Sequence, residues 1–298
     1  MGRRPATRGA LRLVAPSAAE LRGLYGPDSE AWKLNREATL LLGAGPRALL
    51  LQLAHPLVAA GVDEHSTFRA DPWARLEATL RSYLRIVYGT ATAARAEIQR
   101  LNELHRSIRG SGYRARDPDL SLWVHATLVD TTIVAHDAWI EPLDRARRER
   151  YYEETKPIGR AFGVPATKLP RDLATFDAYV AGMLAPDGPV HVSPVARDLA
   201  RAVLHPPMGP VVPALAWLPV ETYAWTLWPA IGLLPDATRR EYELRWGALE
   251  QAVSAWLVAV WRFWRPLLPA DFRQMPQALA ADRRLRSVTS VPRAAPRP

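Results

Sequence analysis

The side chains in this sequence best suited to chemistry are histidines, and His105 has the most informative context. It lies in LNELHRSIRGSGYRARDP, residues 101–118, where apolar residues at helical spacing are followed by Gly110 and Gly112. Glycines after such a pattern are typical of a helix end. The imidazole is therefore expected within about two turns of a helix C-terminus. A histidine there is either a partly buried structural residue or a ligand, and its own segment leaves both readings open.

Motif absences exclude most alternative chemistries. The sequence has no cysteine, no His-Glu-x-x-His or Glu-x-x-His pair, no Gly-x-Ser-x-Gly, no Gly-x-Gly-x-x-Gly and no P-loop. These absences argue against thiolate-held metals, zinc proteases, di-iron bundles, serine hydrolases and nucleotide-dependent enzymes. What remains is a cofactor held by one imidazole. A haem b site needs an axial histidine, an apolar slot and basic residues for the propionates.

A second polar feature is the pair Arg75 and Thr79, which lie at i and i+4 on one predicted helix. Residues at this spacing share a helix face. Tyr83 and Ile86 continue that face, so we expect Arg75 and Thr79 to point inward. A buried guanidinium is costly unless it meets an anion or another polar partner.

Further candidates for contact with a cofactor are Arg106, Arg109, His55, His65 and His125. His125, on the next predicted helix, is the alternative axial ligand. The two arginines are candidates for propionate contacts, with solvent-exposed ion pairs as the alternative. His55 and His65 are expected as helix caps or polar groups beside the cofactor rather than as ligands.

The elements that must position these residues are predicted to be helices. Apolar residues recur at helical spacing over most of the chain, whereas no convincing alternating strand pattern and no fixed-period repeat occur. The fold class is therefore all-α. Asp71-Pro72 and Asp117-Pro118 are strong helix starts. The helices are expected at 46–62, 71–90, 90–110, 117–140, 143–163, 170–185, 193–205 and 235–269, with the first of them apolar nearly all round.

Composition sets the domain plan. The chain has 298 residues, of which 48% are hydrophobic, and a formal net charge of +9. We expect basic disordered tails at 1–20 and 276–298 and one helical domain at 21–275. No nucleic-acid motif accompanies the charge. No export signal is evident, which predicts a cytoplasmic location. The apolar segment 210–235 is broken by prolines, so it is expected to touch a membrane at most and not to span it.

One resemblance covers roughly residues 30 to 270. The ordered series HPLVAAGVDEHSTF, RLEAT, LHRSIRG and LWVHATLVDT is similar to the oxygenase family of the bacterial rubber oxygenases and the fungal mycophenolate-pathway oxygenase. The resemblance implies an all-α, single-domain bundle, broadly globin-like, with a buried slot for one non-covalent haem b. It further implies His105 as the axial ligand and metal-binding residue, with Arg75 and Thr79 on the opposite side. Ala78 stands where rubber-cleaving members carry lysine.

The function that follows is a haem-dependent oxygenase. Its partners would be O₂, a small apolar substrate with a carbon–carbon double bond, and an electron donor. Arg75 and Thr79 would position oxygen by hydrogen bonds, and helices around 47–62 and 210–234 would line the slot. A non-catalytic haem or lipophile carrier is the alternative, and a helical protein without cofactor is the third reading.

Overall fold

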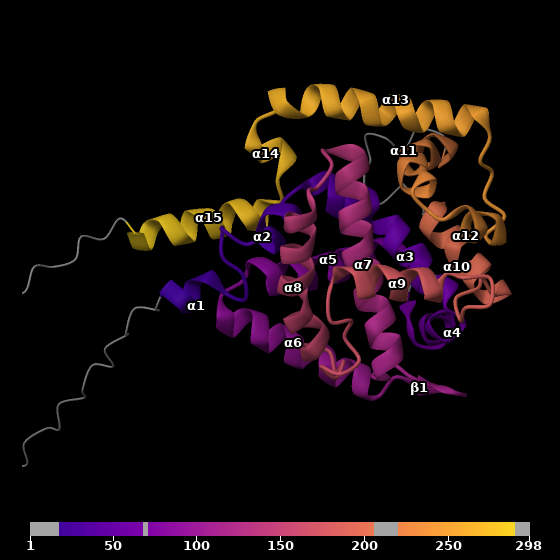
Figure 1. Ribbon diagram of the computed structural model, residues 1–298, viewed down its shortest axis with the longest axis horizontal. Helices are drawn as coiled ribbons and strands as arrows, with labels where there is room; N and C mark the ends of the chain where they lie inside the picture. Colours follow the sequence, from indigo (N-terminus) through magenta and orange to yellow (C-terminus); the bar gives the residue numbers. More distant parts are fainter. Residues whose placement is uncertain (1–17, 68–70, 206–219, 290–298) are drawn as a thin grey trace, which may run out of the picture.

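The computed structural model describes residues 18–67, 71–205 and 220–289, and within these ranges the chain is almost entirely helical (Figure 1). The α-helices are α1 (Ala18–Arg22), α2 (Glu30–Asn35), α3 (Ala44–Ala54), α4 (Pro56–His65), α5 (Pro72–Tyr88), α6 (Ala91–Arg106), α7 (Pro118–Trp139), α8 (Arg145–Ala161), α9 (Leu173–Met183), α10 (Pro194–Leu204), α11 (Val220–Gly232), α12 (Asp236–Glu241), α13 (Ala248–Trp264), α14 (Ala270–Arg273) and α15 (Pro276–Thr289). A π-helical turn η1 (Thr39–Gly43), a 3-10 turn η4 (Arg265–Leu267) and a two-stranded antiparallel sheet, β1 (Arg109–Gly110) with β2 (Tyr113–Arg114), complete the elements. The predicted all-α class is confirmed.

The helix starts follow the sequence signals closely at two places. The Asp71 carboxylate accepts a hydrogen bond from the Ala74 amide at 2.9 Å, and Pro72 is the first residue of α5. Asp117 caps α7 in the same way, accepting from the amide of Asp119 at 2.8 Å. An aspartate followed by proline satisfies a free amide and presets the first helical φ, which explains why both boundaries are sharp.

Three expectations about element bounds are wrong. The apolar helix 46–62 is two helices, because Pro56 cannot continue α3 and instead starts α4. The long helix 235–269 is interrupted between α12 and α13, where Glu243 takes a positive φ of 57°. The expected disordered tail from 276 begins as α15, whose Ala278 and Ala281 are fully buried beside Met275 in the core.

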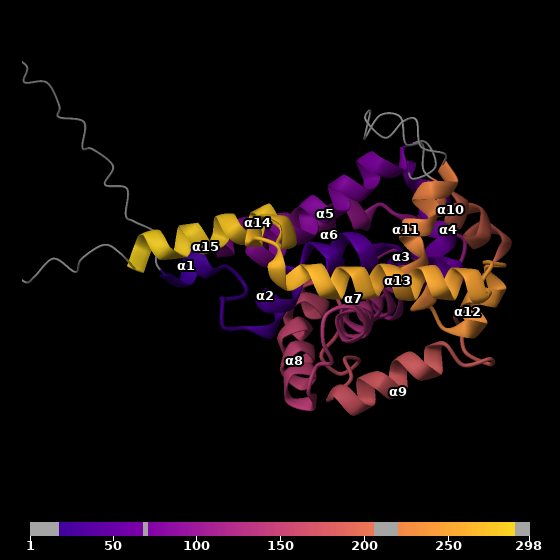
Figure 2. The ribbon, with the colours of Figure 1, turned by 90° about the horizontal axis from the view of Figure 1, so that it is seen from above.

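Helix α7 is the centre of the fold and contributes to each hydrophobic cluster found in the described residues. Its Ala126, Val129 and Ile133 pack with α2, α5, α8 and α15. On another side, Trp123 packs among the apolar residues of α3, α4 and α10. Figure 1 shows α7 within the body of the molecule and α13 along its upper edge, so that α13 crosses in front of the other helices when seen from above in Figure 2. Both views show α1 beside α15.

The end of α3 is held by side chains from distant helices. The last carbonyls of a helix have no partner within that helix. The Trp123 indole donates to the Leu51 carbonyl at 3.1 Å, and the Tyr242 hydroxyl donates to the Leu50 carbonyl at 2.7 Å. These two hydrogen bonds hold the end of α3, just before the break at Pro56, within the core.

Arg47 on α3 ties three helices together. Its side chain is 4% exposed. Nη1 donates to Thr131 Oγ1 at 2.7 Å and lies 2.8 Å from Asp130 Oδ2, both on α7. Nε donates to the Leu233 carbonyl just after α11 at 2.8 Å. A buried guanidinium with this many partners stabilises the packing only as long as each partner is in place.

Replacing Arg47 by methionine should therefore destabilise the fold strongly. The change leaves the Asp130 carboxylate and the Leu233 carbonyl without their cationic donor, which typically costs about 3–5 kcal/mol. Urea denaturation at neutral pH measures the loss. The matched control is Arg81→Met, because Arg81 pairs with Glu77 at a site where both side chains are 69% exposed, and exposed pairs contribute about 0–1 kcal/mol. Equal midpoints for the two variants would contradict the role given to Arg47.

Candidate functional site

Helices α5 and α6 form an antiparallel pair that brings the predicted site residues into register. The chain turns at Gly89 and Thr90, and the Thr90 hydroxyl accepts from the Ala93 amide to cap α6. Across the pair, Arg100 Nη2 donates to Ser82 Oγ at 3.1 Å. Counting back along α5 and forward along α6 from this contact places residues 75–79 opposite residues 103–107. The start of α5 therefore faces the helix end that carries His105.

His105 lies in the last turn of α6, as predicted, and is half-buried. Its ring makes no hydrogen bond to any residue that the structure describes. Burial lowers the pKa of His105, and the charges of Arg75, Arg116 and Arg100 lower it further. The imidazole is consequently neutral at neutral pH, which is the form that binds a metal.

Arg75 and Thr79 do not point inward as expected. Both are exposed, as are all residues 74–79 of α5. Their helix face does become buried further along, at Ser82 and Ile86. The expectation failed because only the second half of this α5 face packs against α6. The Thr79 hydroxyl donates to the Arg75 carbonyl at 2.9 Å, as serine and threonine often do within helices.

The segment after His105 is fastened to α4 through Glu64 and His65. The Tyr113 hydroxyl donates to Glu64 Oε2 at 2.7 Å, and His65 Nε2 lies 3.1 Å from the Arg109 carbonyl. A Cβ on Gly110 would lie 2.4 Å from the same Glu64 oxygen and 2.5 Å from the Tyr113 ring, so a larger residue there would displace this contact. The Glu-His pair thus holds the β1–β2 hairpin, and with it the end of α6. His65 acts here as an anchor.

The remaining cofactor candidates are accounted for by local structure. His55 caps α4, because its Nδ1 accepts from the Leu57 amide at 3.3 Å, and burial lowers its pKa. Arg106 forms an exposed ion pair with Glu103 at 2.8 Å, the alternative expected for it. Arg109 has an exposed side chain on the hairpin.

His125 occupies a different place, between α7 and α8. Its Nε2 is buried without a hydrogen-bond partner, and a Cβ on Gly159 would lie 3.4 Å from that nitrogen. Leu169 closes the same spot. Burial lowers the pKa of His125 to about 4. The contact with α8 leaves no room for a porphyrin on this nitrogen, so the geometry favours His105 over His125 as an axial ligand.

The surroundings of His105 suit a haem better than a metal held by protein ligands alone. Within the described ranges, no three His, Asp or Glu side chains gather in a way that could hold a metal ion. A haem iron needs one imidazole, since the porphyrin supplies four nitrogens. Leu76 on α5 and Leu104 on α6 are 42% and 45% exposed near this helix end, so apolar surface is available for a macrocycle.

Sequence reasoning missed two cations of this site. Arg116 follows the hairpin and Arg100 lies more than one turn before His105, yet both act on its imidazole. Neither Arg75 nor Arg116 forms an ion pair with a described residue, whereas Arg100 pairs with Glu97 at 2.5 Å. Arg116 cannot be assigned to this site from the sequence, because only the folded hairpin brings it back to the end of α6.

The helices expected to line the cofactor slot are described only in part, and the described part does not line a slot. In 47–62, Leu50, Leu51 and Leu53 are buried in the core. Of 210–234, residues 210–219 lie outside the described residues, and the rest forms α11 and the turn after it.

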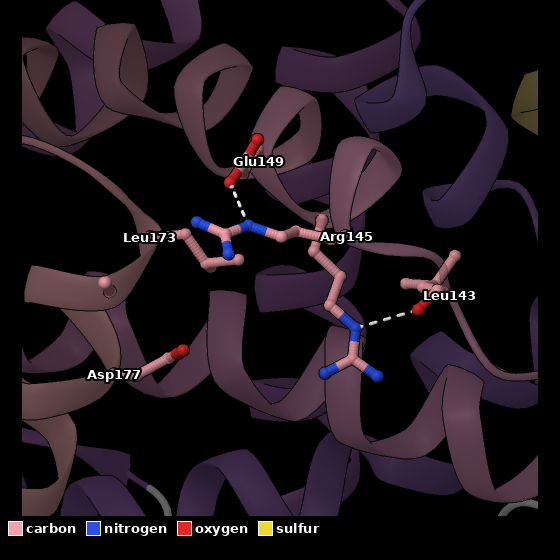
Figure 3. Close-up of a pocket in the computed structure, with 7 residues that line it drawn as sticks. Leu143, Arg145, Glu149, Leu173 and Asp177 are labelled. Atoms are coloured by element: carbon pink, nitrogen blue, oxygen red, sulfur yellow. Dashed lines mark hydrogen bonds and ion pairs between the residues drawn. The ribbon is translucent and has the colours of Figure 1, made fainter.

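A surface cavity of about 420 Å³ lies elsewhere, beside α8 and α9. Figure 3 shows Arg145 reaching Glu149 across it. Arg148 Nε donates to the Leu143 carbonyl at 3.0 Å. Arg148 also pairs with Asp137 at 2.6 Å. Its lining mixes charged side chains with Leu143, Leu173 and Ala174, and both of its arginines are already paired.

Comparison with known proteins decides the family. Residues 32–263 match the family described as ER-bound oxygenase mpaB/B'/Rubber oxygenase, catalytic domain. The chain belongs to this oxygenase family. Two relatives, uncharacterized proteins of Mycobacterium bovis and Mycobacterium tuberculosis, are each 30% identical over 233 residues, covering 74% of this chain and 87% of theirs. No solved structure matches the chain.

Membership confirms the resemblance seen in the sequence and the oxygenase function that it implies. An oxygenase acts on O₂ and an organic substrate, so these two are partners of the family's catalytic domain. The matched residues run from α2 to the end of α13, and they include α5, α6 and the helix end that carries His105.

The environment of His125 generates a prediction for stability. Because its pKa is about 4 in the folded chain and 6.5 when unfolded, the unfolded chain takes up the proton first as pH falls. The stability that depends on neutral His125 is therefore fully present above pH 6.5 and falls as the pH drops toward 4. At about pH 5 the free energy of unfolding should be lower by about 2 kcal/mol than at neutral pH.

His125→Leu removes this titration and should flatten the fall in unfolding free energy between neutral pH and about pH 5. Urea denaturation at several pH values measures it. His205→Gln is the matched control, because His205 is exposed and should leave the pH profile unchanged. A wild-type profile in His125→Leu would show that this histidine is not held neutral by burial.

Proposed function

We propose that this chain is a haem b-dependent oxygenase in which His105 would hold the haem iron. The observation that carries the proposal is the neutral imidazole of His105 at the end of α6. The ring has no hydrogen-bond partner among the described residues and lies near Arg75 and Arg116, which form no ion pair with a described residue. Family membership supplies the oxygenase chemistry. When bound, the haem would supply the redox centre that oxidation of a carbon–carbon double bond requires.

The residues around His105 would divide the tasks of holding the cofactor. His105 would donate its ring lone pair to the iron, which needs the neutral form that burial and the neighbouring arginines favour. Arg116 would meet a propionate carboxylate, since a guanidinium and a carboxylate form strong charge-assisted hydrogen bonds. Arg106 is less suited, because its charge is already balanced by Glu103.

Arg75 and Thr79 would act on the reactants. Arg75 is permanently protonated and has donors in a fixed planar arrangement. Thr79 can turn its hydroxyl away from the Arg75 carbonyl when an oxygen acceptor is present, because rotation about χ1 leaves the backbone unchanged. Donors fixed on a helix stabilise developing negative charge without reorganising at the moment of reaction.

The substrate class follows from the apolar surface at the same helix ends. Leu76 and Leu104 present exposed apolar side chains, and no acidic residue is among the groups that act on His105. A small, uncharged, alkene-bearing molecule fits this environment, since burying these side chains favours association with an apolar ligand.

Haem binding is the first test. After reconstitution with hemin, the wild-type chain should bind one b-type haem per chain, as measured by the pyridine haemochrome spectrum and the Soret band. His105→Ala should lose most of this haem, because no other ligand replaces the imidazole. The matched control is His55→Ala, which removes a histidine that caps α4 and should keep the Soret band.

Failure of the wild-type chain to bind haem would overturn the proposal as a whole. Retention of haem in His105→Ala with loss in His55→Ala would overturn the ligand assignment alone. A haem-bound chain that consumes no O₂ with any alkene and reductant supplied would identify a carrier instead.

Arg75 generates a test that does not depend on turnover. In the haem-free chain, Arg75→Gln should raise the pKa of His105, because one of the positive charges that lower it is removed. The titration is read from the His105 ring resonances by NMR. Arg81→Gln is the control, since Arg81 lies on the same helix, pairs with Glu77 and does not act on His105.

In the reconstituted protein, Arg75→Gln and Thr79→Val should keep haem and change reactivity. The reduced protein should be reoxidised by air faster, and oxygenation of an accepted substrate should slow by about 100-fold. Wild-type behaviour in both assays would assign these two residues to packing or solvation.

A further inference from the structure

Helix α13 lies on the outside of the molecule, at one edge (Figures 1 and 2). Its inner side packs on α11 and α7, and Val258 and Trp261 contact the cluster around Trp139. Both ends are fixed. Glu250 accepts from the Gly247 amide at 2.8 Å at the start, and Arg265 pairs with Glu37 at 2.7 Å just beyond the end. The outer face is therefore held in a defined orientation.

That outer face is apolar and aromatic. Leu249, Trp256 and Phe263 are 58%, 63% and 66% exposed and follow each other every seven residues, which places them on one side of the helix. Small residues at 252 and 259 fill the positions between them and are exposed too. Exposed apolar side chains also follow the end of the helix. We call the whole set the α13 face: Leu249, Trp256, Phe263, Trp264, Leu267 and Phe272.

Most of the large hydrophobic side chains that are exposed in the described residues lie on the α13 face. It holds six of the eleven large hydrophobic side chains that are exposed in the described ranges, including every exposed Trp and Phe among them. Single exposed apolar residues need no explanation, but several gathered along one helix and the short segment after it indicate an interaction surface.

Few charges lie along this face. Its span, residues 249–272, contains two arginines, Arg262 and Arg265, and two acidic residues: Glu250, which is buried and paired with Arg245, and Asp271, which is exposed beside Phe272. Arg265 is paired with Glu37, which leaves Arg262 as the exposed cation on the helix. The chain as a whole carries +9. This charge opposes contact with a second copy of the same face and favours an anionic partner.

We propose that the α13 face docks on the surface of a bilayer that contains anionic lipid, with the helix lying in the plane of the interface. A helix with Trp, Phe and Leu on one side and basic residues beside them is the pattern of interfacial helices. Tryptophan side chains are favoured at the headgroup level. In the described part of the chain, no helix has the length and apolar character needed to cross a bilayer.

This inference is independent of haem binding and is tested on the full chain without cofactor. Flotation with vesicles of phosphatidylcholine containing phosphatidylserine measures the partition coefficient, with phosphatidylcholine alone as the neutral comparison. Trp256→Glu and Phe263→Glu, each made singly, should lower partitioning by about tenfold or more, because an inserted apolar side chain becomes charged. Arg262→Gln should weaken binding only to the anionic vesicles.

The matched control is Leu42→Glu, which makes the same charge change at a side chain that is 52% exposed outside the α13 face. It should partition like the wild-type chain to within about twofold. All these positions are exposed, and far-UV circular dichroism confirms that each variant is folded.

Three results would overturn the proposal. Equal binding of wild type and both α13 variants would assign any lipid affinity to the basic chain ends. Equal binding to neutral and anionic vesicles would remove the role of charge. Absence of vesicle binding, with a wild-type dimer that Trp256→Glu converts to monomer in light scattering, would show that a second copy covers the face.

Discussion

The buried guanidinium of Arg47 is the interaction on which the arrangement of the central helices depends. It fixes α3 against α7 through Thr131 and Asp130, and it fixes the end of α11 through the Leu233 carbonyl. A charge in this position tolerates no sliding of one helix along another, because any shift leaves a buried polar group unpaired. Apolar packing alone would permit more than one register, so this contact gives the core a single arrangement.

From this core the fold reaches the candidate site through two connections. Helix α7 packs against α2 and α8, and α5 packs in turn against α2 and α15, which sets the direction of α5. The hairpin that enters α7 is fastened to α4 by Tyr113 and Glu64, which sets the end of α6. His105 therefore stands between a helix positioned by the core and a hairpin positioned by α4. The start of α5 extends past both supports, which is why Arg75 and Thr79 are exposed.

The sequence predicts those parts of this arrangement that depend on local chemistry. Asp71-Pro72 and Asp117-Pro118 place two helix starts correctly, because a capping carboxylate and a fixed φ act within a few residues. His55 before Pro56 is the same device with a weaker cap. Capping was one of the two roles expected for His55, whereas the helix break at Pro56 was missed. The inward direction of Arg75 was wrong because it depends on where α6 ends opposite α5. Helix α15 was mistaken for a tail because three arginines stand close together at its end, and because the residues that pack it into the core, such as Ala278 and Ala281, are too small to give a strong apolar pattern.

The electrostatics at the end of α6 link the state of His105 to what binds beside it. Arg75 and Arg116 disfavour a proton on the imidazole, and they have no carboxylate partner among the described residues. Their mutual repulsion is tolerable because Arg75 and Arg116 are both exposed to water. An anionic group between Arg75 and Arg116 would be attracted by both cations. The same anion would also favour a proton on His105, unless the ring nitrogen were already bound to another ligand. The proposed haem would meet both conditions, because its carboxylates would pair with the cations while its iron kept the imidazole unprotonated.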